Sequence, residues 1–278
     1  MKILKSRIFL VLITAVICIC TTAYAVSLTA TSISYGNGTV KDALDDLYTK
    51  RDSGNLKLCK FIDGTYGAKG TVGAKYECTL GDKDANDNLI KRNFYILSVN
   101  SDNTVDMIMD RNITEETENK KISWNDAMNY FNNGNPGYKY TTAWTLVVSI
   151  GLPSSVSVAR AVDNNSWKLN DTWFCFGLKD TSSCIANNYA NATPQAIEAV
   201  QKYKWLFNYL SSCIAFGCDS ETELDSTEAG GYWCKDNWRN SSNAMTVDHT
   251  GRLNDTSTTN PNFGIRPAIT VLKLSLYE

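Results

Sequence analysis

The sequence has only one histidine, His249, among its 278 residues. A Ser–His–Asp or Cys–His catalytic arrangement would have to use this side chain, and no G-x-S-x-G sequence is present to hold a nucleophilic serine. Zinc clusters are also excluded, because the chain has no C-x-x-C pair and one histidine cannot complete a second cluster. The letters "VDHTG" around His249 are typical of a turn between two strands, so we assign it no catalytic role.

Neither sign of charge is in excess, since 27 Lys and Arg stand against 29 Asp and Glu. This balance gives no basic face for nucleic acid and no reason to expect an acidic ligand. The chain does have seven Trp, fourteen Tyr and frequent Asn, a composition suited to adaptable contact and poor in acid–base groups. The composition therefore favours a binding protein over an enzyme.

The N-terminus has the pattern of an export signal. A positively charged start is followed by an apolar run from Ile8 to Cys20, broken only by Thr14, and by the A-x-A sequence at Ala23–Ala25. This pattern predicts a signal peptide over residues 1–25 and a secreted or cell-surface protein. Extending the run through Val26 brings it near the roughly 20 residues of a membrane span, so an uncleaved anchor stays as an alternative.

The cysteines fit an oxidising compartment. Seven of the nine remain after cleavage, and most of them are expected to form disulfides. Proximity in the sequence favours the pairs Cys59–Cys78, Cys175–Cys184 and Cys213–Cys218. Cys234 is then left unpaired. It is either a buried thiol or a reactive thiol, or one of these three pairs is wrong.

Residues 26–55 are predicted to form an extended and helical stalk with a linker. Thr39 is expected to cap a short helix with Asp42 in the reciprocal position, and apolar residues recur on one face of it. Such a helix either docks onto the main domain or lets the stalk assemble into a homo-oligomer. The linker "RDSGN" precedes the main domain, predicted at residues 56–278.

The main domain mixes strands and helices without βαβ alternation, which predicts the α+β class. A hairpin is expected between Phe94 and Asp110, and a helix after Ser123 in "SWNDAMNYF". A second helix is expected after the Leu152-Pro153 turn, and the longest one in "TPQAIEAVQKYKWLFNYL". Four short strands follow in "GGYWC", "NAMTVD", "GRLND" and "FGIRPAITVLKL".

Two acidic stretches raise the question of calcium. "DKDAND" places Asp82, Asp84 and Asn86 at alternating positions, as an EF-hand loop does, but lacks the Gly and Glu that complete the loop. "CDSETELDSTE" alternates four carboxylates in the same way. Solvated loop charge accounts for both stretches, so we expect no cofactor and keep calcium at Asp82, Asp84 and Asn86 as a weak alternative.

The segment "NFGIRPAITV" carries Gly, Arg and Pro inside an otherwise strand-like pattern. Together with "SWNDAMNYF", "GLPSS" and "GGYW", it resembles the bacterial C-type-lectin-like fold. The resemblance is greatest to the extracellular domains of Gram-positive gut bacteria that end in "GVRPVITL". The sequence is more distantly similar to formylglycine-generating-enzyme-like domains and phage tropism determinants. The resemblance implies that the segment is a closing strand. Gly264 would allow close packing, Arg266 would pair with an internal acceptor, and Pro267 would sit at a bulge near the sheet edge.

The functional residues of the families that this sequence resembles have no counterparts in it. "WND" at Trp124–Asp126 opens an early helix, whereas the sugar-binding calcium triplet of animal lectins lies on a late strand. The catalytic cysteine pair of the formylglycine-generating enzyme has no counterpart, because Cys234 stands alone.

We expect the ligand surface in the loop-rich segment between "GGYW" and "GIRP". Trp238 lies among charges and amides and is expected to be an exposed anchor, whereas Trp233 belongs to an inner strand and is expected in the core. The predicted ligand-binding residues are Trp233, Asp236, Asn237, Trp238, Arg239, Asn240, Asn243, His249, Arg252 and Asn254.

The sequence therefore predicts a secreted or surface-anchored protein with a C-type-lectin-like domain behind a short helical stalk. Its partner would be an extracellular protein or glycan, with membrane contact only through an uncleaved N-terminal segment. The alternatives are a structural subunit of a fibre or pilus-like assembly, and an enzyme of the formylglycine-generating or hydrolytic type.

Overall fold

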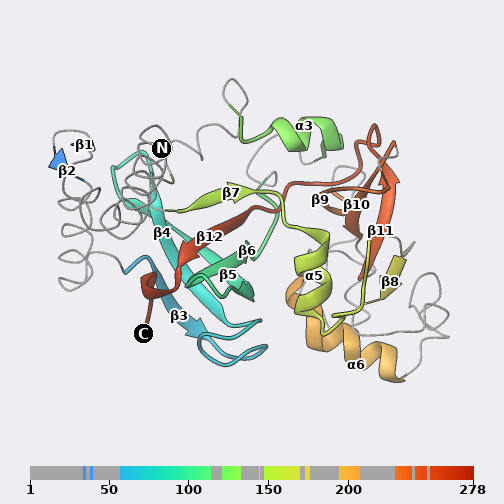
Figure 1. Ribbon diagram of the computed structural model, residues 1–278, viewed down its shortest axis with the longest axis horizontal. Coiled ribbons are helices and arrows are strands. Elements are labelled where there is room, and N and C mark those ends of the chain that lie inside the picture. Colours follow the sequence, from blue (N-terminus) through green and yellow to red (C-terminus); the bar gives the residue numbers. More distant parts are fainter. Residues whose placement is uncertain are drawn as a thin grey trace, which may run out of the picture. The chain divides into compact units, whose positions relative to one another are not determined.

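In the part of the chain that it describes, the computed structural model contains a seven-stranded sheet, a four-stranded sheet, a two-stranded sheet and a few short helices (Figure 1). The described residues are 34–35, 38–39, 57–113, 121–132, 144, 147–169, 173–175, 194–206, 229–239, 242–248 and 251–278.

The contacts within the chain divide it into two units, residues 1–57 and 58–278. The first unit has one described hairpin, in which β1 (Ser34–Tyr35) pairs with β2 (Gly38–Thr39). The predicted leader and stalk helix lie outside the described residues and stay predictions.

The larger sheet has seven strands in the order β13-β3-β4-β5-β6-β12-β7. Only β13 and β3 pair in parallel, with Leu276 opposite Cys59, and every other pair is antiparallel. The strands are β3 (Cys59–Asp63), β4 (Lys75–Lys83), β5 (Leu89–Val99), β6 (Thr104–Met109), β7 (Ser149–Gly151), β12 (Ala268–Leu272) and β13 (Leu276–Tyr277).

The predicted hairpin between Phe94 and Asp110 is confirmed as β5 and β6. Its turn is stabilised locally, because the Asp102 carboxylate accepts hydrogen bonds from the backbone N–H and the hydroxyl of Thr104. Asn103 has a φ of 62°, a left-handed conformation that asparagine tolerates better than most residues.

The predicted disulfide Cys59–Cys78 joins β3 and β4, where the two residues are direct cross-strand partners. The other two predicted pairs involve Cys184, Cys213 and Cys218, which lie outside the described part of the chain. Cys234 is a free, buried cysteine.

The smaller sheet has four antiparallel strands in the order β8-β11-β10-β9. The strands are β8 (Trp173–Cys175), β9 (Gly231–Asn237), β10 (Asn243–Asp248) and β11 (Arg252–Ser257). Three of the four strands predicted for the end of the chain form this sheet, and the fourth is β12 of the larger sheet. Gly231 starts β9 at a φ of 141°, and a Cβ there would come 2.0 Å from the Val247 carbonyl oxygen, so this position requires glycine.

The described residues of the second unit also form three short helices and two 3₁₀ turns. They are α3 (Trp124–Asn129), α5 (Ser155–Ala161), α6 (Pro194–Tyr203), and the 3₁₀ turns Lys204–Leu206 and Lys273–Ser275. As predicted, the Ser123 hydroxyl accepts from the Asp126 N–H at the start of α3. Helix α6 gives way to a 3₁₀ turn at Lys204, and the predicted continuation beyond Leu206 lies outside the described residues.

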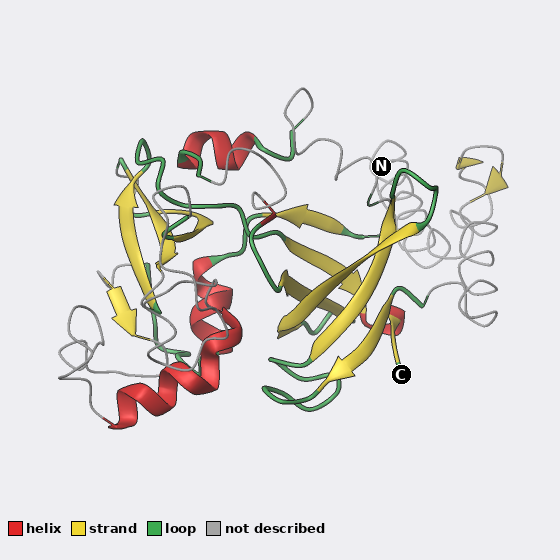
Figure 2. Cartoon of the chain, turned by 180° about the vertical axis from the view of Figure 1, so that it is seen from behind, coloured by secondary structure: helices red, strands yellow, loops and turns green. Residues whose placement is uncertain are grey.

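Helix α5 lies between the two sheets, where it contacts β5 of the larger sheet and β9 of the smaller one (Figure 2). One buried cluster joins α5 and the 3₁₀ turn after α6 to strands of both sheets. A second cluster covers the opposite face of the larger sheet and includes Trp144, Trp233 and Phe263. Strand β9 contributes to both, because Tyr232 and Cys234 enter the first cluster and Trp233 enters the second.

The described part of the chain is rich in strands and has few helices, which fits an α+β or a mostly-β class. Within that part, no helix has the length and the apolar character needed to span a membrane.

Candidate functional site

The predicted ligand residues that the structure describes lie on or beside three neighbouring strands of the smaller sheet, β9, β10 and β11. Asn240 and His249 were also predicted for this surface, but they lie outside the described residues. The sequence segment thus forms one continuous piece of sheet, although several of its side chains face inward.

Trp238 is buried, with 8% of its surface exposed, so the expectation of an exposed aromatic anchor was wrong. Its backbone N–H donates to the Asn243 carbonyl oxygen, 2.9 Å away, which fixes it at the start of the β9–β10 connection. The ring joins the apolar cluster beneath the sheet with Met245 and Leu253. Of the neighbouring charged side chains, Arg239 lies over the buried ring.

Arg239 is the exposed member of this pair. Its guanidinium carbon lies 4.8 Å from the centre of the Trp238 ring, a distance at which a cation is attracted to the face of an aromatic ring. Arg239 has a φ of 46°, in the left-handed region that an arginine adopts only when its surroundings require it. The connection therefore holds a cationic side chain close to a buried ring.

Trp233 is fully buried, as its place in an inner strand predicted. Its indole Nε1–H donates to the Ile122 carbonyl oxygen at 2.8 Å, and its ring lies 5.0 Å from that of Phe263, centre to centre. Trp233 was predicted as a ligand residue, but in the structure it is a core residue that packs inside the protein.

Asp236 holds the start of helix α5. Its Oδ2 accepts from the Ser155 N–H at 2.5 Å, from the Ser155 hydroxyl at 2.6 Å and from the Ser154 hydroxyl at 3.3 Å. Ser154 is the N-cap residue, but its own side chain caps no backbone N–H. A carboxylate from β9 therefore caps the start of this helix.

The remaining predicted polar residues are bonded within the sheet. The Asn243 amide donates to Asp255 at 2.7 Å, and the Arg252 guanidinium lies 3.4 Å from Asp248. Asn254 accepts from the Asp255 N–H through its side chain and is partly buried. Asn237 is also partly buried and pairs with Ala244 across the β9–β10 ladder.

Cys234 carries no exposed thiol. Burial, with a smaller contribution from the negative charge of Asp236, raises the pKa of the Cys234 thiol well above its ordinary value. A thiol that stays protonated is a poor nucleophile.

The two acidic side chains of the possible calcium loop serve different local structures. Asp82 is buried, and its Oδ2 accepts from Arg92 at 2.9 and 3.1 Å. Asp84 is exposed and accepts from the backbone N–H groups of Asn86 and Asn88. These hydrogen bonds lower the pKa of Asp84, and the bond from the Asn88 N–H has the largest effect. Among the described residues, no cluster of three metal-ligating side chains occurs.

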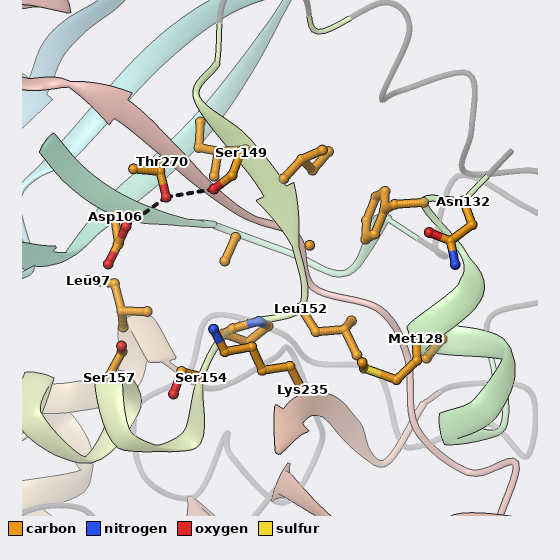
Figure 3. A pocket seen from close by; sticks show the side chains of 17 residues that line it. Leu97, Asp106, Met128, Asn132, Ser149, Leu152, Ser154, Ser157, Lys235 and Thr270 are labelled. Atoms are coloured by element: carbon orange, nitrogen blue, oxygen red, sulfur yellow. Dashed lines mark hydrogen bonds between the residues drawn. The ribbon is translucent and has the colours of Figure 1, made fainter. Parts of the chain in front are cut away.

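A cavity of about 300 Å³ lies beside the edge strand β7, and the sequence did not predict it. It is lined by residues of β5, β6, α3, β7, α5, β9 and β12. Figure 3 shows hydroxyl and charged side chains, including Asp106, Ser149 and Ser157, toward one end, and Leu152 and Met128 toward the other. Because the lining comes from many separated segments, no local motif marks this site.

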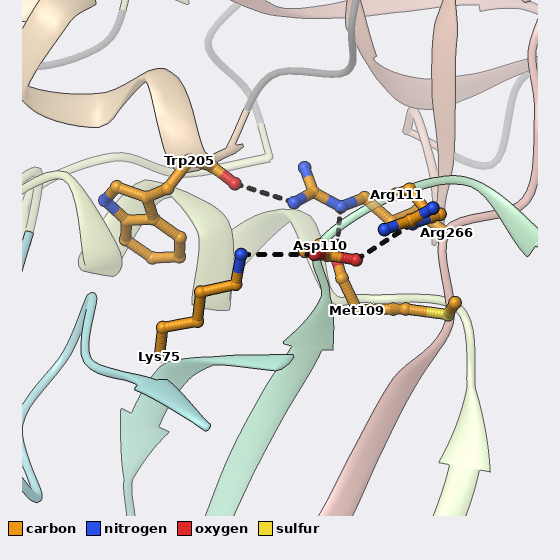
Figure 4. Close-up of polar contacts among 6 residues, drawn as sticks. All are labelled: Lys75, Met109, Asp110, Arg111, Trp205 and Arg266. Atoms are coloured by element: carbon orange, nitrogen blue, oxygen red, sulfur yellow. Dashed lines mark hydrogen bonds and ion pairs between the residues drawn. The ribbon is translucent and has the colours of Figure 1, made fainter. Parts of the chain in front are cut away.

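Two residues of the segment "GIRP" make their hydrogen bonds inside the protein. Arg266 is fully buried, and its Nε donates to the Met109 carbonyl oxygen while its Nη2 donates to that of Trp205 (Figure 4). Gly264 exchanges backbone hydrogen bonds with β9, donating to Gly231 and accepting from Trp233.

Pro267 lies next to the strand that neighbours the edge strand β7, and the ladders of β12 with β6 and β7 have no register shift. Pro267 directly precedes β12, which lies between β6 and β7, and its carbonyl oxygen accepts from the Met109 N–H at 2.9 Å. A proline is tolerated at a strand start, where its missing N–H interrupts no ladder.

No family model, no curated protein and no solved structure matches this chain.

Proposed function

We propose that this protein is a secreted or cell-surface binding protein of the C-type-lectin-like type, which contacts an extracellular protein or glycan through the connection between β9 and β10. The cross-strand disulfide Cys59–Cys78 and the N-terminal leader pattern support an oxidising compartment. The buried hydrogen bonds of Arg266 support the internal pairing that the lectin-like resemblance implies for this residue.

The Trp238–Arg239 pair is the observation that carries the proposal. An arginine that is exposed and yet held against a buried ring loses little side-chain entropy when it contacts a partner. Arginine is also enriched among the residues that dominate binding energies, because its guanidinium offers several donors and a flat apolar face. Arg239 therefore replaces the exposed tryptophan as the expected centre of the contact surface.

Glycan and protein arrays probed with the purified protein test this proposal. For the ligand that the arrays identify, Arg239→Ala should weaken binding by about thirtyfold, which corresponds to roughly 2 kcal/mol. Arg160→Ala is the matched control, because Arg160 is an exposed arginine on helix α5. Equal binding by both variants would remove the β9–β10 connection from the contact surface.

Two further measurements address the compartment and the assembly. N-terminal sequencing of the exported protein should find Val26 first, whereas an intact Met1 in the membrane fraction would favour the anchor. The mass of the native protein should be that of a monomer, whereas an obligate assembly would favour the fibre subunit.

A further inference from the structure

Lys235 supplies a positive charge to the cavity beside β7. Lys235 lines the cavity from β9, its side chain is exposed, and no ion pair to it occurs among the described residues. The next residue, Asp236, has its carboxylate on the start of α5 instead. The hydroxyls of Ser154 and Ser157 line the cavity beside Lys235, and they are three residues apart and so lie on the same side of this chain segment (Figure 3).

The opposite wall of this polar end presents acceptors. The Ser149 hydroxyl donates to Thr270 Oγ1 at 2.9 Å, and the Thr270 hydroxyl donates to Asp106 Oδ1 at 2.8 Å. The Ser98 hydroxyl donates to the other oxygen of Asp106 at 2.8 Å. The hydroxyl protons of Ser149 and Thr270 are both used in these hydrogen bonds. Ser149 Oγ therefore keeps its lone pairs as acceptors and Asp106 keeps its negative charge, and both attract an N–H donor.

The other end of the cavity is apolar. Leu152, Met128 and Phe131 line it, and Met128 is 39% exposed although it is a large apolar side chain. A volume of about 300 Å³ lies at the lower limit of known small-molecule sites. The site therefore has room for a small molecule or the end of a chain.

We infer that this cavity binds an α-amino carboxylate with an apolar side chain, which is either a free amino acid or the C-terminal residue of a peptide. The carboxylate lies against Lys235 and the hydroxyl of Ser157, since the Ser154 hydroxyl already donates to Asp236. The ligand nitrogen, as an ammonium or a peptide N–H, donates toward Asp106 and Ser149, and the apolar side chain packs on Leu152, Met128 and Phe131. This site is independent of the β9–β10 connection, so either proposal can fail alone.

Calorimetric titration of the purified protein with five probes tests the inference. The probes are leucine, N-acetyl-leucine, leucinamide, and the peptide acetyl-Ala-Ala-Leu with a free or an amidated C-terminus. Tighter binding of leucine than of N-acetyl-leucine identifies a free amino acid, and tighter binding of the acetylated peptide identifies a chain end. Both outcomes support the site, provided that leucinamide and the amidated peptide bind at least about tenfold more weakly, as the loss of a charge-assisted hydrogen bond requires.

The variant Lys235→Gln should weaken the binding of the best probe by about tenfold, because it removes the cation and leaves the fold untouched. Lys273→Gln, an exposed lysine on the turn after β12, is the matched control and should change nothing. The inference is overturned if no probe binds, if the amides bind as well as the acids, or if Lys235→Gln and Lys273→Gln bind alike. Methyl shifts of Met128 in an NMR titration provide a second readout, and they should move with the carboxylate probes only.

Discussion

The guanidinium of Arg266 donates to the carbonyl oxygen of Trp205, with 2.6 Å between Nη2 and that oxygen. The two residues are 61 positions apart in the sequence. The acceptor belongs to the 3₁₀ turn that ends helix α6, and the donor to the segment that leads into β12. The same guanidinium lies 5.2 Å from the centre of the Tyr232 ring on β9. One buried cation thus ties a helix end to strands of both sheets.

Replacing Arg266 with alanine should therefore lower the free energy of unfolding by about 3 kcal/mol, because buried carbonyl oxygens lose their donor and a cavity is left. Arg266→Lys should also be destabilising, since an ammonium cannot reproduce the planar set of donors. Denaturant titrations of both variants check this expectation. A parent-like midpoint with lost ligand binding would mean instead that "GIRP" belongs to a binding site.

Trp238→Ala should cost about 3 kcal/mol of stability, since it empties a place in the apolar cluster beneath the smaller sheet. Arg239→Ala should cost less than about 1 kcal/mol, the range of an exposed cation–π contact. Thermal or chemical unfolding distinguishes the two. Acrylamide quenching adds a separate check, because the accessible fraction of the emission should not fall in Trp238→Phe.

Asp236→Ala should destabilise the protein by about 1–2 kcal/mol, because the start of α5 loses its acceptor. Asp236→Asn keeps a side-chain oxygen and should recover most of that loss. Hydrogen exchange should show faster opening of α5 in the alanine variant, with β5 and β6 unchanged. Glu198→Ala serves as the control, since Glu198 is an exposed residue of helix α6 and its replacement should change the stability very little.

Cys234 should make stability depend on alkaline pH. Its pKa is raised in the folded protein, so its contribution is complete below the ordinary thiol pKa and is lost as the pH rises above it. Above about pH 8.5 the free energy of unfolding should fall by roughly 1.4 kcal/mol per pH unit on account of this one group. Cys234→Ala should remove that slope, and comparison of the two proteins from pH 7.5 to 9.5 measures it.

The same burial predicts slow chemistry at this thiol. Iodoacetamide should modify Cys234 only as fast as the protein unfolds, because the reagent needs an accessible thiolate. Rapid labelling of the native protein, located by peptide mapping, would show that β9 is open to solvent at this position.

Much of the strand and helix pattern could be predicted because it depends on neighbours in the sequence. Ser123 caps α3 through an N–H three residues away, and the turn of the β5–β6 hairpin is stabilised by Asp102, two residues from Thr104. The disulfide Cys59–Cys78 could be predicted for the same reason, since the two cysteines belong to strands that are neighbours in the sequence and in the sheet. Alternation, caps and turns are local signals.

The side-chain roles at the site could not be predicted because they depend on distant partners. Asp236 caps a helix whose first residue, Ser155, is 81 positions earlier, and nothing near Asp236 in the sequence indicates this. Trp238 is surrounded by polar letters, yet its burial is decided by Met245 and Leu253 on the two following strands. The cavity draws on segments from Leu97 to Thr270, so it emerges only when both sheets are in place.

The hydrogen bond from the Leu58 N–H to the Ser275 carbonyl oxygen, at 3.0 Å, and the parallel pairing of β3 with β13 have a consequence for the connectivity of the second unit. Its first and last residues lie close enough for a short peptide to join residue 278 to residue 58 and turn the unit into a ring. Such a ring could be cut open at the exposed turn between β4 and β5, around Asp87, without breaking either buried cluster. A chain that begins at this turn and ends at it would therefore synthesise the strands in a different order and still fold them into the same arrangement.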